Sequence, residues 1–163
     1  MPALPKNSSA PDIKLKTTAG EEFSLESARK QGPVLATFFK VECPTCQYAL
    51  PFIQRLADAY PQINIVGVSQ NDKPETEQFM KQYGLKMPVA IDDKSKYVAS
   101  NAYGLTHVPS IFYISRDGKV EDSIVSWSKA DMEALNNRIA ADAGVPPASL
   151  FKPGEQVADF KAG

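Results

Sequence analysis

Cys43 and Cys46 are the two cysteines of this 163-residue chain, and Pro44 and Thr45 separate them. The pair comes directly after an apolar run and directly before a segment with helical spacing. In the first turn of a helix, two sulfurs at this separation can close a small disulfide ring with little backbone movement. The first sulfur also faces unpaired backbone N–H groups and the positive end of the helix dipole, which favour the thiolate that attacks disulfides. The spacing therefore predicts reversible thiol–disulfide chemistry.

A strand and a helix are expected to position the two cysteines. Residues 34–39 form a nearly continuous apolar run, which is typical of a central strand covered on both faces. Pro44 suits the first helical turn, because its missing N–H would have no intrahelical partner there. The helix is expected to bend at Pro51 and to stop at Pro61. The apolar residues at helical spacing are Leu50, Ile53, Leu56 and Ala57.

The rest of the chain predicts further strands and helices in alternation. Residues 10–25 are expected to form a small hairpin that turns at Gly20. A second hairpin, of the Asp-Gly kind, is expected between residues 110–115 and 120–125. The remaining expected elements are strands at 63–68 and 87–92 and helices at 72–84, 94–103 and 128–143. This order of elements predicts one α/β domain.

The chain divides into an N-terminal arm at residues 1–9, a domain at residues 10–143 and a tail at residues 144–163. The tail is punctuated by Pro and Gly and has too few apolar residues to fold alone. We expect it to be mobile or loosely docked; the alternative is that it covers a groove or contacts a partner. Trp127, just before the last helix, is expected to pack in the core and not to form a recognition surface.

Composition excludes several classes of function. The net charge of −1 gives no basic surface for phosphate backbones, so no nucleic acid partner is expected. The longest apolar stretch is too short to span a bilayer.

The first residues show no apolar signal core, which favours the cytoplasm, or a periplasmic or other extracytoplasmic site if a leader was removed. Zinc would need two ligands besides the cysteines, and His107 supplies at most one, so no metal or cofactor is expected.

Three features together resemble the thioredoxin superfamily: the Cys-Pro-Thr-Cys sequence at 43–46 after the first core strand, Pro51 in the helix, and Val108-Pro109 before the second hairpin. Ala10-Pro11-Asp12, the early Gly20 turn and the inserted segment before Val108 are similar to the TlpA/ResA-like branch of AhpC/TSA-type redoxins. The resemblance covers residues 10–143. It implies a three-layer fold with a central mixed sheet flanked by helices and an N-terminal hairpin.

The resemblance also implies how the site works. Pro109 is expected to follow a cis peptide bond beside the two sulfurs, which turns the Val108 backbone toward an extended partner segment. Cys43 is expected to attack a partner disulfide and Cys46, deeper in the helix, to resolve the mixed disulfide. The expected activity is that of a thiol-disulfide oxidoreductase. Its partners would be protein disulfides or dithiols, and the chain is expected to be a monomer.

The sequence departs from the family near the cysteines, where Glu42, Pro44 and Thr45 are expected to tune the pair. Glu42 stands where many relatives carry Trp, and its carboxylate disfavours a thiolate on Cys43. Ala49 and Thr37 occupy positions where relatives carry acids, so Glu42 is either a substitute proton acceptor or a solvated loop charge. Because no His or Arg lies between the cysteines, we expect a reductant rather than a strong oxidant.

Two other functions compete with this interpretation. A peroxiredoxin-like thiol peroxidase shares the fold, but its Pro-x-x-x-Thr-x-x-Cys motif is absent. Cys46 has Phe39 and Cys43 in place of the Pro and Thr, and Cys43 has Ala36 and Lys40. The other alternative is a redox-inert binding module. His107 is expected to be a loop histidine without catalytic duty.

Overall fold

Five strands form the central mixed sheet of the computed structural model, which describes residues 3–163. In spatial order they are β5 (Val89–Ile91), β4 (Asn64–Ser69), β3 (Val34–Phe39), β6 (Ser110–Ile114) and β7 (Val120–Val125). β3 runs parallel to β4 and antiparallel to β6, so it lies at the centre of the sheet. The helices are α1 (Leu25–Arg29), α2 (Pro44–Ala59), α3 (Lys73–Tyr83), α4 (Val98–Ala102) and α5 (Lys129–Ala143).

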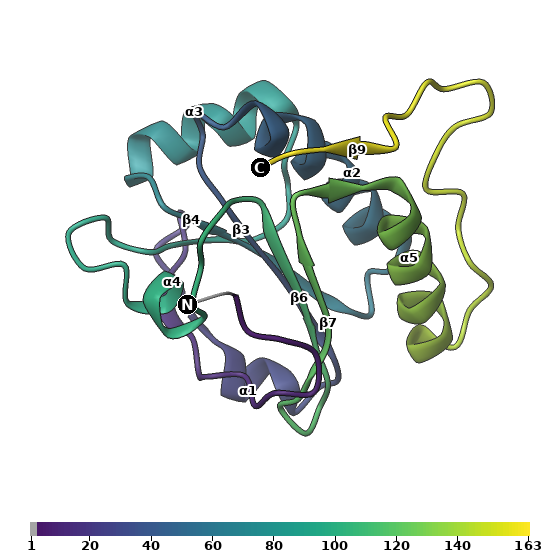
Figure 1. Cartoon of the computed structure of the whole chain (residues 1–163). Coiled ribbons are helices and arrows are strands. Elements are labelled where there is room, and N and C mark those ends of the chain that lie inside the picture. The colour runs from purple at the N-terminus through teal and green to yellow at the C-terminus, as the bar shows by residue number, and fades with distance from the viewer. Residues whose placement is uncertain (1–2) are drawn as a thin grey trace.

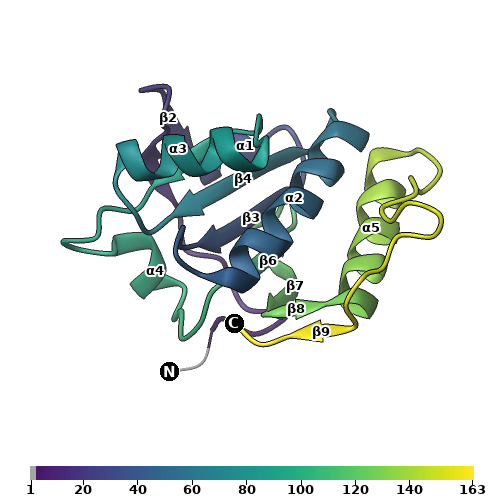
Figure 2. The same ribbon diagram turned by 90° about the horizontal axis from the view of Figure 1, so that it is seen from above.

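Both faces of β3 are covered, which explains its continuous apolar sequence. One face packs against α2, α3 and α5 through Leu35 and Phe39. The other face packs against α1 and α4 through Val34, Ala36 and Phe38. Helices therefore lie on both sides of the sheet (Figures 1 and 2), and the predicted three-layer α/β fold is confirmed.

Two small antiparallel pairs lie outside this sheet. β1 (Lys14–Lys16) and β2 (Glu22–Ser24) form the expected N-terminal hairpin. β8 (Trp127–Ser128) pairs with β9 (Phe160–Lys161), a strand near the C-terminus that the sequence did not indicate. Residues 1 and 2 of the expected N-terminal arm lie outside the described residues. Among residues 3–163, no helix has both the length and the apolar character needed to cross a membrane.

Local capping residues set the ends of the long helices close to the predicted positions. Asp72 accepts a hydrogen bond from the Glu75 backbone N–H at 3.0 Å at the start of α3. Ser128 does the same for the Asp131 backbone N–H at 3.2 Å at the start of α5. α5 ends at Ala143, as predicted, and Gly144 follows as its C-cap with a φ of 71°. These side-chain caps satisfy N–H groups that lack intrahelical partners.

The segment between β4 and β6 differs from expectation in detail. The expected helix at 94–103 is confined to α4, and the expected strand at 87–92 is confined to β5. The reason lies in Asp92, whose buried carboxylate accepts hydrogen bonds from the Ala99 and Ser100 backbone N–H groups at 3.1 and 2.7 Å. This contact starts the helix four residues later than the pattern indicated. α1 was also missed, because five residues are too few to show helical periodicity.

The tail after α5 is packed against the domain as far as residue 158, which corrects the expectation of a mobile or loosely docked tail for these residues. The Leu150 side chain is buried in the core cluster that contains α2. Arg55 on α2 pairs with both carboxylate oxygens of Glu155 at 2.8 Å. Trp127 is fully buried, as predicted, and its indole N–H donates to the Ala158 carbonyl at 2.7 Å. The chain then returns toward the start of α2, where the C-terminus lies in both views (Figures 1 and 2).

Candidate active site

Cys43 is the N-cap residue of α2, directly after the loop that leaves β3. Its sulfur accepts a hydrogen bond from the Cys46 backbone N–H at 3.2 Å, and Pro44 occupies the first helical turn. The backbone donor and the helix dipole both stabilise negative charge on this sulfur. Cys43 is half-buried, so this residue is in part exposed to solvent.

Cys46 has a different environment one turn further along α2. Its side chain is fully buried, and both cysteines are free thiols. Burial is the main cause that raises the pKa of the Cys46 thiol, and a hydrogen bond with Cys43 adds to it. The charge of Lys40 and a backbone hydrogen bond from the same residue oppose the shift. Cys46 therefore holds its proton strongly and must transfer it before it can act as a nucleophile.

The loop before β6 lies against Cys43. The Val108–Pro109 peptide bond is cis, as predicted. The Val108 carbonyl oxygen lies 3.5 Å from the Cys43 sulfur, within reach of a hydrogen bond from the thiol. Val108 is half-buried and Pro109 is buried. The fold thus brings together residues that are 65 positions apart in the chain.

Two of the three residues expected to tune the thiols, Glu42 and Thr45, are fixed by side-chain hydrogen bonds. Glu42 is exposed, and its carboxylate accepts a hydrogen bond from the Asn71 side-chain amide. The same Asn71 side chain accepts from the Val41 backbone N–H at 3.0 Å, so it holds the loop before the cysteines. Thr45 is buried and donates its hydroxyl to the Ala162 carbonyl oxygen. Glu42 is therefore an exposed loop carboxylate that the Asn71 side chain holds in place.

The two positions where relatives carry acids are buried and uncharged here. Ala49 packs in the core on α2, and Thr37 is buried in β3. The Thr37 hydroxyl has no hydrogen-bond partner within residues 3–163. The ionisable residues that act on the Cys46 thiol are Cys43 and Lys40. Neither supplies a carboxylate to accept the proton of Cys46.

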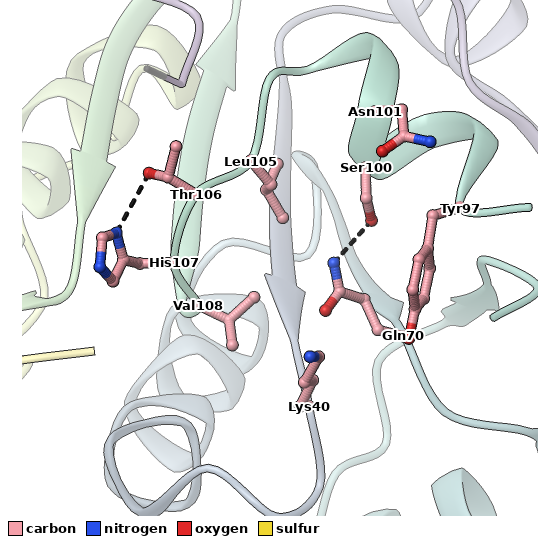
Figure 3. Close-up of a pocket in the computed structure, with 9 residues that line it drawn as sticks. All are labelled: Lys40, Gln70, Tyr97, Ser100, Asn101, Leu105, Thr106, His107 and Val108. Carbon is pink, nitrogen blue, oxygen red and sulfur yellow. Dashed lines mark hydrogen bonds between the residues drawn. The ribbon is translucent and has the colours of Figure 1, made fainter. Parts of the chain in front are cut away.

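A pocket of about 200 Å³ lies beside the Val108 loop (Figure 3). Lys40 lines it from the end of β3, and Gln70 donates to the Ser100 hydroxyl at 2.8 Å. His107 is exposed, and Figure 3 shows its ring turned toward the Thr106 hydroxyl, 3.1 Å from Nδ1. This placement agrees with a loop histidine that takes no part in the thiol chemistry.

The C-terminal residues reach this site. The sequence left open that the tail covers a groove, but it did not indicate contacts with the cysteine motif or with Val108. Gly163 donates its backbone N–H to the Ser126 hydroxyl at 2.9 Å. A Cβ added to Gly163 would clash with the Val108 carbonyl oxygen. The Thr45 hydroxyl donates to the carbonyl oxygen of Ala162, the residue before Gly163. No local pattern signals such contacts, because they join residues that are 37 and 117 positions apart.

Comparisons with known proteins agree with this geometry. Residues 7–123 match the AhpC/TSA family. Thiol-disulfide oxidoreductase ResA of a Bacillus cereus strain is 31% identical over 135 residues, which cover 80% of this chain and 76% of that protein. A solved structure described as a putative thiol:disulfide interchange protein DsbE from Chlorobium tepidum has a TM-score of 0.76 at 28% identity and covers 87% of this chain and 100% of that chain. The structure of MTB dsbF has a TM-score of 0.69 at 26% identity, with 79% and 93% of the two chains covered.

Proposed function

Since the chain belongs to the AhpC/TSA family and is a thiol-disulfide oxidoreductase, we propose that it reduces disulfides of partner proteins, with Cys43 as the attacking thiol and Cys46 as the resolving thiol. One observation carries the assignment of roles. The Cys43 sulfur accepts a helix N-terminal N–H at a half-buried position, whereas Cys46 is fully buried behind it. A partner disulfide can therefore reach the first sulfur and not the second.

The reaction proceeds in two exchanges. The Cys43 thiolate attacks one sulfur of the partner disulfide, and the other partner sulfur leaves as a thiolate and takes a proton. Cys46 then gives up its proton and attacks the Cys43 sulfur, which releases the second partner thiol. The pair loses two electrons and becomes a disulfide, while the partner disulfide gains two electrons and becomes a dithiol.

Two features of the site support the reducing direction. No cationic side chain lies between the two cysteines, and Glu42 places a carboxylate next to Cys43. Proteins that act as strong oxidants stabilise their reduced form, chiefly by favouring the thiolate. At Cys43, the N-terminus of α2 stabilises a thiolate, but the residues between the two cysteines supply no positive side chain. A thiolate stabilised in this moderate way suits a pair that gives its electrons to a partner.

Val108 supports the choice of a protein partner. Its carbonyl oxygen lies 3.5 Å from the proposed attacking sulfur and belongs to the half-buried loop residue before β6. An extended segment that carries a disulfide can pair with such backbone groups as an added strand, and these contacts place its sulfur beside Cys43. The expected substrates are thus disulfides in extended polypeptide segments.

The roles are tested by trapping the intermediate. Cys46→Ser keeps the attacking sulfur and removes the resolving one, so we expect it to accumulate a mixed disulfide with a protein such as insulin, which the wild type reduces in the presence of a dithiol donor. Cys43→Ser is the matched control and is expected to form little adduct, because the buried Cys46 is not accessible. Mass spectrometry identifies the linked cysteine. An adduct formed mainly through Cys46 would reverse the assignment.

A further inference from the structure

The last residues of the chain lie on the surface where a substrate segment is expected. β9 pairs antiparallel with β8, with Lys161 opposite Trp127 and Phe160 opposite Ser128. Lys129 also donates its backbone N–H to the Asp159 carbonyl at 3.0 Å. β9 and the two residues after it thus run from β8 toward the start of α2 (Figure 2), the helix that begins with the cysteine motif.

The end of this strand occupies groups that belong to the active site. Thr45, within the cysteine motif, donates its hydroxyl to the Ala162 carbonyl. Gly163 lies so close to the Val108 carbonyl oxygen that a side chain at this position would clash with it. Val108 is the residue whose backbone is proposed to receive the partner segment. The tail therefore takes the position of a partner strand.

The tail is held strongly at one end and weakly at the other. Before residue 159, the buried Leu150, the Arg55–Glu155 pair and the Trp127–Ala158 hydrogen bond fix it to the domain. Residues 159–163 are all exposed, and the Phe160 side chain is 64% exposed. Their contacts are backbone pairing, two hydroxyl hydrogen bonds and the Lys161 ammonium, 5.0 Å from the centre of the Tyr48 ring. The final residues can thus separate while the rest of the tail stays docked.

We propose that residues 159–163 act as a substrate-like strand that competes with partner proteins for the edge of β8 and for Val108. This inference rests on the proposed function of the Val108 loop. A polypeptide that carries a disulfide in an extended segment must displace the strand before its sulfur reaches Cys43. A small-molecule disulfide needs no strand pairing and reaches the half-buried Cys43 with the tail in place. The tail therefore lowers the rate with proteins selectively and leaves the thiol chemistry unchanged.

Lys161→Pro tests the proposal in the full chain, because proline cannot donate a backbone hydrogen bond from β9. Lys161→Ala is the matched control, since it removes the same ammonium but keeps the backbone N–H. We expect Lys161→Pro to raise kcat/KM for insulin disulfides about tenfold over Lys161→Ala, the effect of losing one or two backbone hydrogen bonds that hold the strand. The rate with a small aromatic disulfide is expected to change less than about twofold, the range of a surface substitution.

Binding without redox chemistry separates this inference from the proposed function. The probe is the insulin B chain with carbamidomethylated cysteines, and its Kd is expected to fall about tenfold in Lys161→Pro relative to Lys161→Ala, the same free-energy change as for the rate. If neither variant reduces insulin, the proposed reductase function fails, while the Kd values still decide the role of the tail. Equal Kd values in the two variants, with faster amide exchange at residues 159–163 in Lys161→Pro, would overturn the inference. The inference would also be overturned if Lys161→Pro raised the reduction rates of the small aromatic disulfide and of insulin by the same factor.

Discussion

The two thiols belong to one short motif, yet their surroundings differ. Cys43 caps α2 and accepts the Cys46 backbone N–H, so negative charge on its sulfur is stabilised where a partner can reach it. Cys46 is buried three residues further on, and burial favours its protonated form. The difference arises from position on the helix, because both residues carry the same functional group.

Burial of Cys46 leads to a prediction about alkaline pH. Its pKa is raised in the folded protein above the usual value of 9.0, so above pH 9.0 the unfolded chain releases this proton before the folded one. Its contribution to stability is complete below pH 9.0 and declines as pH rises further, by up to about 1.4 kcal/mol per pH unit. We therefore expect the reduced protein to lose stability above pH 9.0 more steeply than Cys46→Ala, measured by urea unfolding in the presence of reductant.

Other groups that titrate in this range are shared by the two proteins. Burial also raises the pKa values of Tyr103 and Tyr113, and their contributions cancel in the comparison. The same pH dependence in the wild type and in Cys46→Ala would show that the Cys46 proton is not retained by folding.

At the scale of elements, one ion pair fixes the tail to α2. The Arg55 guanidinium donates to both carboxylate oxygens of Glu155 and to the Leu150 carbonyl oxygen, at 2.8, 2.8 and 3.1 Å. Its planar donors fit a carboxylate in this paired geometry. The hydrogen bond from Arg55 is the main cause that lowers the pKa of Glu155 to about 2.

The lowered pKa of Glu155 predicts that acid loosens the tail. The stabilising effect of the charged Glu155 is present above its usual pKa of 4.5 and is lost as pH falls from 4.5 toward about 2. Trp127, the one tryptophan of the sequence, contacts the tail through Ala158 and reports its release by fluorescence. We expect the wild type to show an acid-dependent fluorescence change in this range that is largely removed in Glu155→Gln.

Glu133→Gln is the matched control, because Glu133 is an exposed glutamate on α5 with no ion pair among the described residues. It is expected to retain the wild-type pH response. A fluorescence change that is identical in the Glu155 and Glu133 variants would exclude the Arg55 pair as its origin.

At the scale of the whole molecule, a small polar network joins α2, α5 and the tail. The Tyr60 hydroxyl at the end of α2 donates to the Asn136 side-chain oxygen on α5 at 2.7 Å. It also accepts from the Ala148 backbone N–H in the tail at 2.9 Å. Asn136 closes the network by donating to the Ala148 carbonyl at 2.8 Å. Each of these polar groups has a partner inside the fold, as buried polar groups require.

Removal of the Tyr60 hydroxyl is expected to destabilise the whole domain. Tyr60→Phe keeps the ring but leaves Asn136 and the Ala148 N–H without their partner, so we expect a loss of about 1–3 kcal/mol in the free energy of unfolding. Tyr83→Phe is the control, because the half-buried Tyr83 hydroxyl makes no hydrogen bond among the described residues, and its effect is expected to stay within about 0.5 kcal/mol. Urea unfolding measures both, and equal losses would contradict the role of the network.

Much of the fold could be predicted because its signals are local. Apolar runs, helical periodicity and the caps at Asp72 and Ser128 specify elements from residues that are neighbours in the chain. Where a distant or buried contact sets a boundary, as Asp92 does at the start of α4, the local pattern gave the wrong length. The candidate site was predictable for a related reason, since the cysteine motif lies within four consecutive residues.

The amino-acid sequence by itself determined the two thiols, their place at the start of a helix and the order of strands and helices around them, because each depends on short-range spacing. The family resemblance, and no local pattern, indicated that Pro109 lies beside the sulfurs. Only the tertiary structure decided that the Cys46 side chain is fully buried and that the residues after 158 lie beside β8, Thr45 and Val108. These outcomes depend on hydrogen bonds and packing between segments far apart in the chain, such as Thr45 with Ala162. Contacts of this kind have no signature in either segment alone.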